Sequence, residues 1–247
     1  MTSVTLPEFS RPSRGPSTLD LIETGEAWSI EPRERGEFLS RALNVVVASV
    51  AIIILIPVFI AVALAVRLTS RGPILYTQPR VGLDRRWRRD NPANSRRETD
   101  LGGRVFRIFK FRTMRVDAET GSGAVWASKR DARVTPIGEF LRKSRLDEIP
   151  QLFNVLKGDM NIVGPRPERP SIFLRLSDQI TAYPVRQRAR PGITGWAQIN
   201  QAYDTCVDDV KRKVAYDLEY LQRQSLLEDI KIMALTIPVM LNRKLGW

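Results

Sequence analysis

An Asp-Glu pair at Asp147 and Glu148 is the strongest candidate for chemistry in this sequence. Pro150 follows two residues later, and it either disfavours helical angles at Ile149 or marks a first helical turn, so both acids stand near a helix N-terminus. Acidic side chains in a first turn complement the helix dipole, and many such pairs have no other role. A catalytic pair would instead supply a carboxylate nucleophile toward phosphorus, which divides a difficult transfer into two easier steps through an aspartyl phosphoanhydride.

Basic residues around this pair favour the catalytic interpretation. A carboxylate among guanidinium groups is expected to stay ionised. Arginine binds a diphosphate with paired hydrogen bonds, and Mg²⁺ can bridge its oxygens. The basic candidates are Lys110, Arg112, Arg142, Arg145, Arg166 and Arg190. The sequence therefore predicts a phosphate site that contains a nucleophile.

The composition limits the chemistry further. The sequence has no histidine, so proton transfer or metal binding must use carboxylates, lysine, tyrosine or water, and a bound metal should be hard and oxygen-ligated. The formal net charge of +12 favours anionic partners, namely nucleic acid, anionic lipid headgroups or phosphorylated substrates.

Two local patterns would position the basic side chains. Residues 105–114 alternate well enough for a strand, which puts Lys110 and Arg112 on one face. Arg166 has proline on both sides, so its backbone neighbours have fixed φ and its guanidinium loses little entropy on binding.

Helices are predicted on both sides of the acidic pair and at the C-terminus. Residues 136–143 and 151–156 have helical patterns, and Gly158 stands where the second helix would end. Residues 208–227 and 228–242 are helical in composition. The last of these helices could lie in a membrane interface or pack against the core, and both alternatives stay open.

A membrane helix is predicted near the N-terminus. Residues 43–66 are almost wholly apolar, and as a helix at ~1.5 Å per residue they would reach ~36 Å, enough to cross ~30 Å of hydrocarbon. A single straight span is one interpretation. Pro57 predicts a kink, and arginines at both ends do not separate a cytoplasmic side from the opposite one, so we favour a helix that enters, bends at Pro57 and returns to the same face.

Four ordered segments together resemble the bacterial sugar transferase family, the monotopic polyprenyl-phosphate phosphoglycosyl transferases, in their minimal catalytic form. These segments are KFRTM at 110–114, LDEIPQLFNVLKGDM at 146–160, VGPRPE at 163–168 and RPGITG at 190–195. The resemblance runs from about residue 43 to the C-terminus. One departure is the helix break, which is a Ser-Pro pair in family members and Ile56-Pro57 here.

The resemblance implies transfer of a sugar-1-phosphate from a UDP-sugar to undecaprenyl phosphate, with release of UMP, as a first membrane step of polysaccharide or glycoconjugate assembly. It implies Asp147 as the nucleophile and Glu148 as the ligand of Mg²⁺. The implied phosphate-binding residues are Lys110, Arg112, Arg142 and Arg166, to which we add Arg190. The implied location is the bacterial inner membrane, with the catalytic domain facing the cytoplasm.

The expected fold class is α+β, mostly helical, with a short β element and one Pro-kinked re-entrant membrane helix. The expected organisation is a flexible tail at 1–37, the membrane helix at 38–72 with its break at Pro57, and a catalytic domain at 73–247. That domain would carry a basic exposed loop at 84–103 and C-terminal interfacial helices. Anionic membrane lipids are expected partners and nucleic acid is not.

Two rival functions remain at this point. The charge alone would suit a membrane-tethered protein that binds nucleic acid or another anionic ligand without catalysis, and such a protein would not need Asp147 or Glu148. A transferase of a bare sugar would leave UDP as its product.

Overall fold

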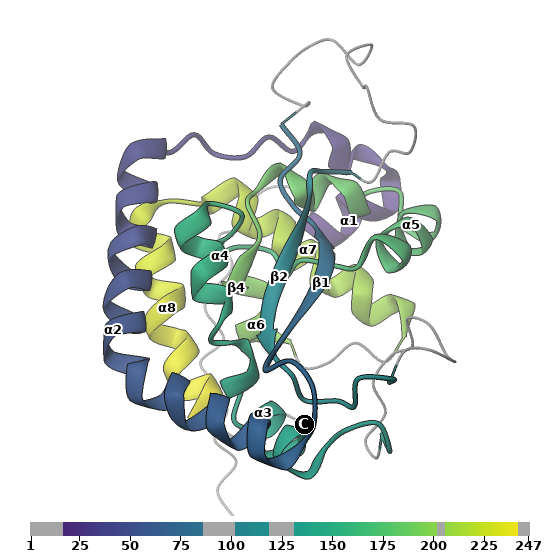
Figure 1. The fold of residues 1–247 in the computed structure, drawn as a ribbon. Coiled ribbons are helices and arrows are strands. Elements are labelled where there is room, and N and C mark those ends of the chain that lie inside the picture. The colour runs from purple at the N-terminus through teal and green to yellow at the C-terminus, as the bar shows by residue number, and fades with distance from the viewer. Residues whose placement is uncertain (1–16, 86–101, 119–130, 202–205, 242–247) are drawn as a thin grey trace, which may run out of the picture.

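The computed structural model describes residues 17–85, 102–118, 131–201 and 206–241 (Figure 1). Most of the predicted basic loop at 84–103 lies outside these residues. The helices are α1 (Thr18–Thr24), η1 (Glu26–Ser29), α2 (Glu37–Thr69), α3 (Pro136–Lys143), η4 (Leu146–Glu148), α4 (Gln151–Lys157), α5 (Pro170–Gln179), η5 (Tyr183–Arg188), α6 (Trp196–Asn200), α7 (Val207–Arg223) and α8 (Leu226–Leu241). The strands are β1 (Leu75–Val81), β2 (Val105–Phe111), β3 (Asn161–Val163) and β4 (Gly192–Thr194). This confirms the α+β class.

Helix α2 has 33 residues and is long and apolar enough to cross a membrane, judged by length and composition. Pro57 lies inside it, and Figure 1 shows α2 running beside α8 along one edge of the molecule and then turning across the bottom. Proline removes a helix hydrogen bond and clashes with the preceding turn, which accounts for a bend.

Polar residues near the start of α2 attach it to the domain. The Arg41 guanidinium donates to the carbonyls of Val155 at 2.5 Å and Leu156 at 2.6 Å, at the C-terminal end of α4. The buried Asn44 side chain accepts a hydrogen bond from the backbone N–H of Ile162 at 2.5 Å, just inside β3. The Arg41 bonds satisfy carbonyls that the end of α4 leaves without partners, and the Asn44 bond satisfies an N–H of β3.

The described residues form two small sheets of two strands each. Strands β1 and β2 are antiparallel, with Tyr76 opposite Lys110. Strands β3 and β4 are parallel, which brings the segments 163–168 and 190–195 side by side. A Cβ at Gly192 would lie 2.1 Å from the backbone nitrogen of Gly164, so this close approach requires glycine.

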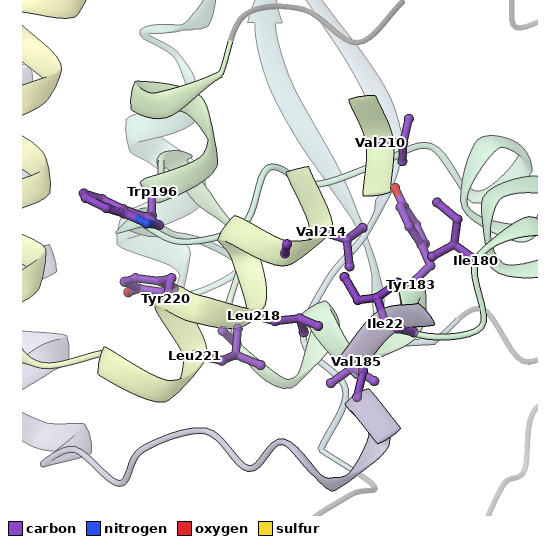
Figure 2. Packing of buried hydrophobic residues seen from close by; sticks show 14 of the residues in the cluster. Ile22, Ile180, Tyr183, Val185, Trp196, Val210, Val214, Leu218, Tyr220 and Leu221 are labelled. Carbon is purple, nitrogen blue, oxygen red and sulfur yellow. The ribbon is translucent and has the colours of Figure 1, made fainter. Parts of the chain in front are cut away.

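The largest core packs around α7 (Figure 2). Val210, Val214, Leu218 and Leu221 recur at helical spacing, so one face of α7 is buried against η5, α6 and the N-terminal segment.

The prediction of a flexible tail at 1–37 is wrong for residues 17–36, and residues 1–16 lie outside the described part. Helix α1 begins with a capping box between Ser17 and Asp20, and Ile22 is buried against α7. This segment lacks a sustained apolar period, yet a few apolar side chains are enough to hold it in place, because α7 supplies the surface on which they pack.

Helix α8 packs against the core along part of its surface, and a position of its other face in a membrane interface stays a prediction. Ile232 is fully buried in the main core, whereas Leu227, Ile237 and Met240 are exposed. Among the predicted interfacial helices, α7 instead packs one face into the core.

Candidate active site

Asp147 and Glu148 lie in the one-turn helix η4, between α3 and α4. Arg145 precedes this turn with φ of 60° and ψ of 11°, a left-handed conformation that reverses the chain after α3. Both acidic side chains are buried, and α4 begins at Gln151. The predicted position of the pair near a helix N-terminus is therefore confirmed.

The Glu148 carboxylate accepts hydrogen bonds from two cations. Its Oε1 accepts from Lys110 Nζ at 2.7 Å and from Arg166 Nη2 at 2.6 Å, and its Oε2 accepts from Arg166 Nη1 at 3.3 Å. Burial opposes its ionisation, but the attraction of Arg166 and Lys110 and their hydrogen bonds outweigh burial and hold the pKa of Glu148 well below its usual range. Glu148 is therefore a fixed anion.

Asp147 has a different environment. Its Oδ2 lies 3.9 Å from Lys110 Nζ, and its buried Oδ1 has no hydrogen-bond partner within the described part of the chain. Burial raises the pKa of Asp147, and the charge of Glu148 adds to this effect while Lys110 opposes it. Cations therefore favour the ionised form at both carboxylates, but burial is the larger effect at Asp147 and the cations are the larger effect at Glu148.

Asn154 holds the two halves of the site together. Its fully buried side chain accepts from the backbone N–H of Phe109 at 2.9 Å and donates to the carbonyl of Arg107 at 2.7 Å. Because these bonds join α4 to β2, they place Lys110 beside Glu148. Asn154 is not among the site residues predicted from the sequence, although an amide within the mostly apolar helix α4 could have indicated a structural role.

The other predicted phosphate-binding residues are distributed more widely. Arg142, in the last turn of α3, is near enough to Asp147 to lower its pKa slightly. The Arg112 guanidinium does not reach the pair, because it donates to the carbonyls of Arg71 at 2.7 Å and Ser70 at 2.8 Å at the end of α2. Strand β2 ends at Phe111, so the alternation that placed Arg112 beside Lys110 does not extend to it.

Arg190 also lies apart from the acidic pair. Burial lowers its pKa, and the charged groups that act on it are Arg85, which follows β1, and Arg41, Arg35 and Glu37, around the start of α2. The structure thus unites Lys110 and Arg166 at Glu148, keeps Arg142 close to Asp147, and places Arg112 and Arg190 elsewhere.

The residues present fit Mg²⁺ only as an ion shared with a substrate. Among the described residues there is no cluster of three or more side chains that could hold a metal. Glu148 offers its Oε2, whose hydrogen bond from Arg166 Nη1 is long, at 3.3 Å. Mg²⁺ is commonly held by one or two carboxylates together with substrate phosphates and water, and this donor set matches that pattern.

The chain is similar to a known family and to several known proteins. The model of the family described as "Bacterial sugar transferase" matches residues 35–243. The chain is 35% identical over 235 residues to UDP-N-acetylgalactosamine-undecaprenyl-phosphate N-acetylgalactosaminephosphotransferase of Aeromonas hydrophila, covering 95% of this chain and 51% of the relative. It is 41% identical over 202 residues to undecaprenyl-phosphate glucose phosphotransferase of Komagataeibacter xylinus, covering 80% of this chain and 35% of the relative.

A relative of more similar length is UDP-glucose:undecaprenyl-phosphate glucose-1-phosphate transferase of Caulobacter vibrioides, 37% identical over 213 residues, which are 85% of this chain and 73% of the relative. The chain spans about half or less of the length of the first two relatives. The family match covers most of the chain and includes both acids and every basic residue of the site. The chain therefore belongs to the bacterial sugar transferase family.

Proposed function

We propose that this protein transfers a sugar-1-phosphate from a UDP-sugar to undecaprenyl phosphate and releases UMP. The relatives' names describe undecaprenyl-phosphate sugar phosphotransferases, which supports the acceptor and the type of group transferred. The observation that carries the mechanism is the contrast within the acidic pair. Glu148 is bound by two cations, while the adjacent Asp147 keeps a buried oxygen without a partner.

In the first step, Asp147 Oδ1 forms a bond to the phosphorus that bears the sugar. The bond from that phosphorus to the bridging oxygen of the diphosphate breaks, and its electron pair leaves with UMP. In the second step, a phosphate oxygen of undecaprenyl phosphate bonds to the same phosphorus, and Asp147 leaves as a carboxylate. Both nucleophiles react as anions, so neither step needs a strong base, which suits a sequence without histidine.

The cations have separate tasks in this proposal. Arg166 and Lys110 neutralise the diphosphate and stabilise charge that develops on it, as fixed cations do in phosphoryl transfer. Arg142 would meet a substrate phosphate on the Asp147 side. Glu148 would hold Mg²⁺, which would supply positive charge to offset that of the substrate phosphates.

The membrane arrangement is part of the proposal. Helix α2 would enter the cytoplasmic leaflet of the inner membrane, bend at Pro57 and return, so that the catalytic domain faces the cytoplasm. Support comes from the bend in α2, from the exposed apolar side chains along it such as Ile53, Ile54 and Ile60, and from the net charge of +12, which favours anionic lipids.

The decisive experiment measures nucleotide release from a panel of UDP-sugars by protein in nanodiscs, with undecaprenyl phosphate and Mg²⁺. We expect UMP from the wild type, none from Asp147→Asn, and loss of activity on adding a chelator. Asp147→Asn preserves the shape of the side chain and removes its charge. Formation of UDP, or UMP release that is indifferent to this change, would refute the aspartyl intermediate.

A further inference from the structure

The short loop that carries Arg166 is held at three consecutive carbonyls. Pro165 O accepts from the backbone N–H of Gly192 at 3.0 Å, Arg166 O accepts from Arg186 Nη2 at 3.0 Å, and Pro167 O accepts from Arg80 Nη1 at 3.1 Å. Two of these donors are guanidinium groups from other elements, η5 and β1.

Arg186 is itself fixed on every side. Its Nε donates to Asp217 Oδ2 at 2.8 Å, its Nη1 donates to the hydroxyl of Tyr183 at 2.9 Å, and its side chain is fully buried. A buried ion pair is often no more stabilising than a well-packed apolar group of similar volume, because both charges lose hydration. Stability alone therefore does not account for this arrangement.

Arg80 provides a second anchor with its own counterion. The same Nη1 donates to Glu168 Oε1 at 3.1 Å, and Nη2 donates to Gln78 Oε1 at 2.8 Å. Strand β1 thus holds the end of the loop that follows Arg166.

These anchors act on a loop that the prolines restrict but do not fix completely. The rings of Pro165 and Pro167 fix their own φ, and Pro167 restricts Arg166 to extended ψ angles, but neither ring fixes the φ angle of Arg166. The hydrogen bond from Arg186 to the Arg166 carbonyl holds this peptide group in one orientation, and with it the path of the loop under the Arg166 side chain that reaches Glu148.

We propose that Arg186 and Arg80 are positioning residues, which act through the backbone of the 165–167 loop to hold the Arg166 guanidinium in its place for the substrate diphosphate. This inference rests on the proposed function. Displacement of a substrate-binding group by about 1 Å can lower a rate on the order of a hundredfold, so the effect is measurable.

The test measures UMP release and thermal unfolding for Arg186→Lys and Tyr183→Phe, each in the wild-type and Arg166→Ala backgrounds. Arg186→Lys keeps the positive charge and removes the fork that joins Asp217 to Arg166 O. We expect kcat/KM for the UDP-sugar to fall about tenfold or more in the wild-type background and less than about twofold in the Arg166→Ala background, with the same loss of Tm in both.

Arg35→Lys is the matched control. Arg35 Nη1 donates to Asp229 Oδ2 at 2.8 Å and to the hydroxyl of Tyr220 at 3.3 Å, so it forms a similar Arg-Asp-Tyr group. It has no hydrogen bond to the 165–167 loop, and we expect Arg35→Lys to lower Tm without the loss of kcat/KM.

The possible results distinguish a failure of the positioning inference from a failure of the proposed function. An equal loss of kcat/KM in both backgrounds, or the same loss in Arg35→Lys, overturns the inference and leaves the proposed function intact. A wild type that releases no UMP overturns both. If Arg186→Lys does not fold, Tyr183→Phe and Arg80→Lys decide the question with the same pair of backgrounds.

Discussion

Asn154→Ala removes both hydrogen bonds that join α4 to the backbone of β2. The lost partners are the N–H of Phe109 and the carbonyl of Arg107, which the amide contacts at 2.9 Å and 2.7 Å. Lys110 follows Phe109 in the strand and contacts Glu148. The substitution should therefore reduce stability and also loosen the charged contact at the active site.

The size of the effect follows from burial. A buried polar group left without a partner costs about 1–3 kcal/mol, so two such groups would cost about 2–6 kcal/mol. Phe109 is only half-buried and Arg107 is exposed, so we take the lower part of this range, about 2–4 kcal/mol. For a chain of this length each kcal/mol shifts Tm by about 2–4 °C, so we expect Tm to fall by roughly 4–16 °C.

Thermal unfolding in detergent, followed by tryptophan fluorescence, measures this change. Asn200→Ala is the control, because Asn200 is exposed and its amide donates only to the carbonyl of Trp196 within its own short helix, at 2.8 Å. We expect the control to change stability by no more than about 0.5 kcal/mol. Equal Tm values for the two variants would refute the reasoning that Asn154 holds β2 against α4.

Three further predictions concern ionisation and packing. Burial raises the pKa of Asp147, and the reacting form is the carboxylate, so UMP release should decline as pH falls through a midpoint above 3.8. Lys110→Met should move that midpoint to higher pH, because the lysine charge lowers this pKa. An unchanged pH-rate profile in this variant would contradict the prediction. Arg112→Ala should lower stability by about 2 kcal/mol in thermal unfolding, through lost bonds to the end of α2, while KM for the UDP-sugar stays within about twofold; a large rise in KM would return Arg112 to the phosphate site. Gly138→Ala places a Cβ 2.0 Å from the backbone oxygen of Thr113 and should lower the free energy of unfolding by about 3 kcal/mol or more. Gel filtration would show this as a loss of folded protein. Gly36→Ala is the control and should fold normally, because its Cβ would meet nothing nearer than 3.8 Å.

Local chemistry in the sequence was enough to predict several elements. The helix at 136–143 agrees with α3, which begins after the capping residue Thr135, and α4 ends at Gly158 with φ of 84° as expected for a left-handed glycine. The long apolar run predicted α2, and Pro57 predicted its bend. Each of these features depends on residues close together in the chain, so local sequence is sufficient to predict it.

The sequence also predicted the acidic pair, because the order and spacing of four segments identify the family. It did not determine which of the basic candidates meet at the pair. Arg112 is two residues from Lys110 in the chain, yet it binds the end of α2 because the strand ends at Phe111. The alternation of side chains along a segment does not show at which residue its pairing with a neighbouring strand ends.

Only the tertiary structure decided which distant residues hold the site in place. Asn154 meets the backbone of β2 across 45 residues, and Arg186 meets Asp217 across 31. Ile22 is buried because α7, far along the chain, covers it. Such pairings depend on how complete elements pack, since burial and hydrogen bonding between them are properties of the folded arrangement, and no short stretch of sequence contains both partners.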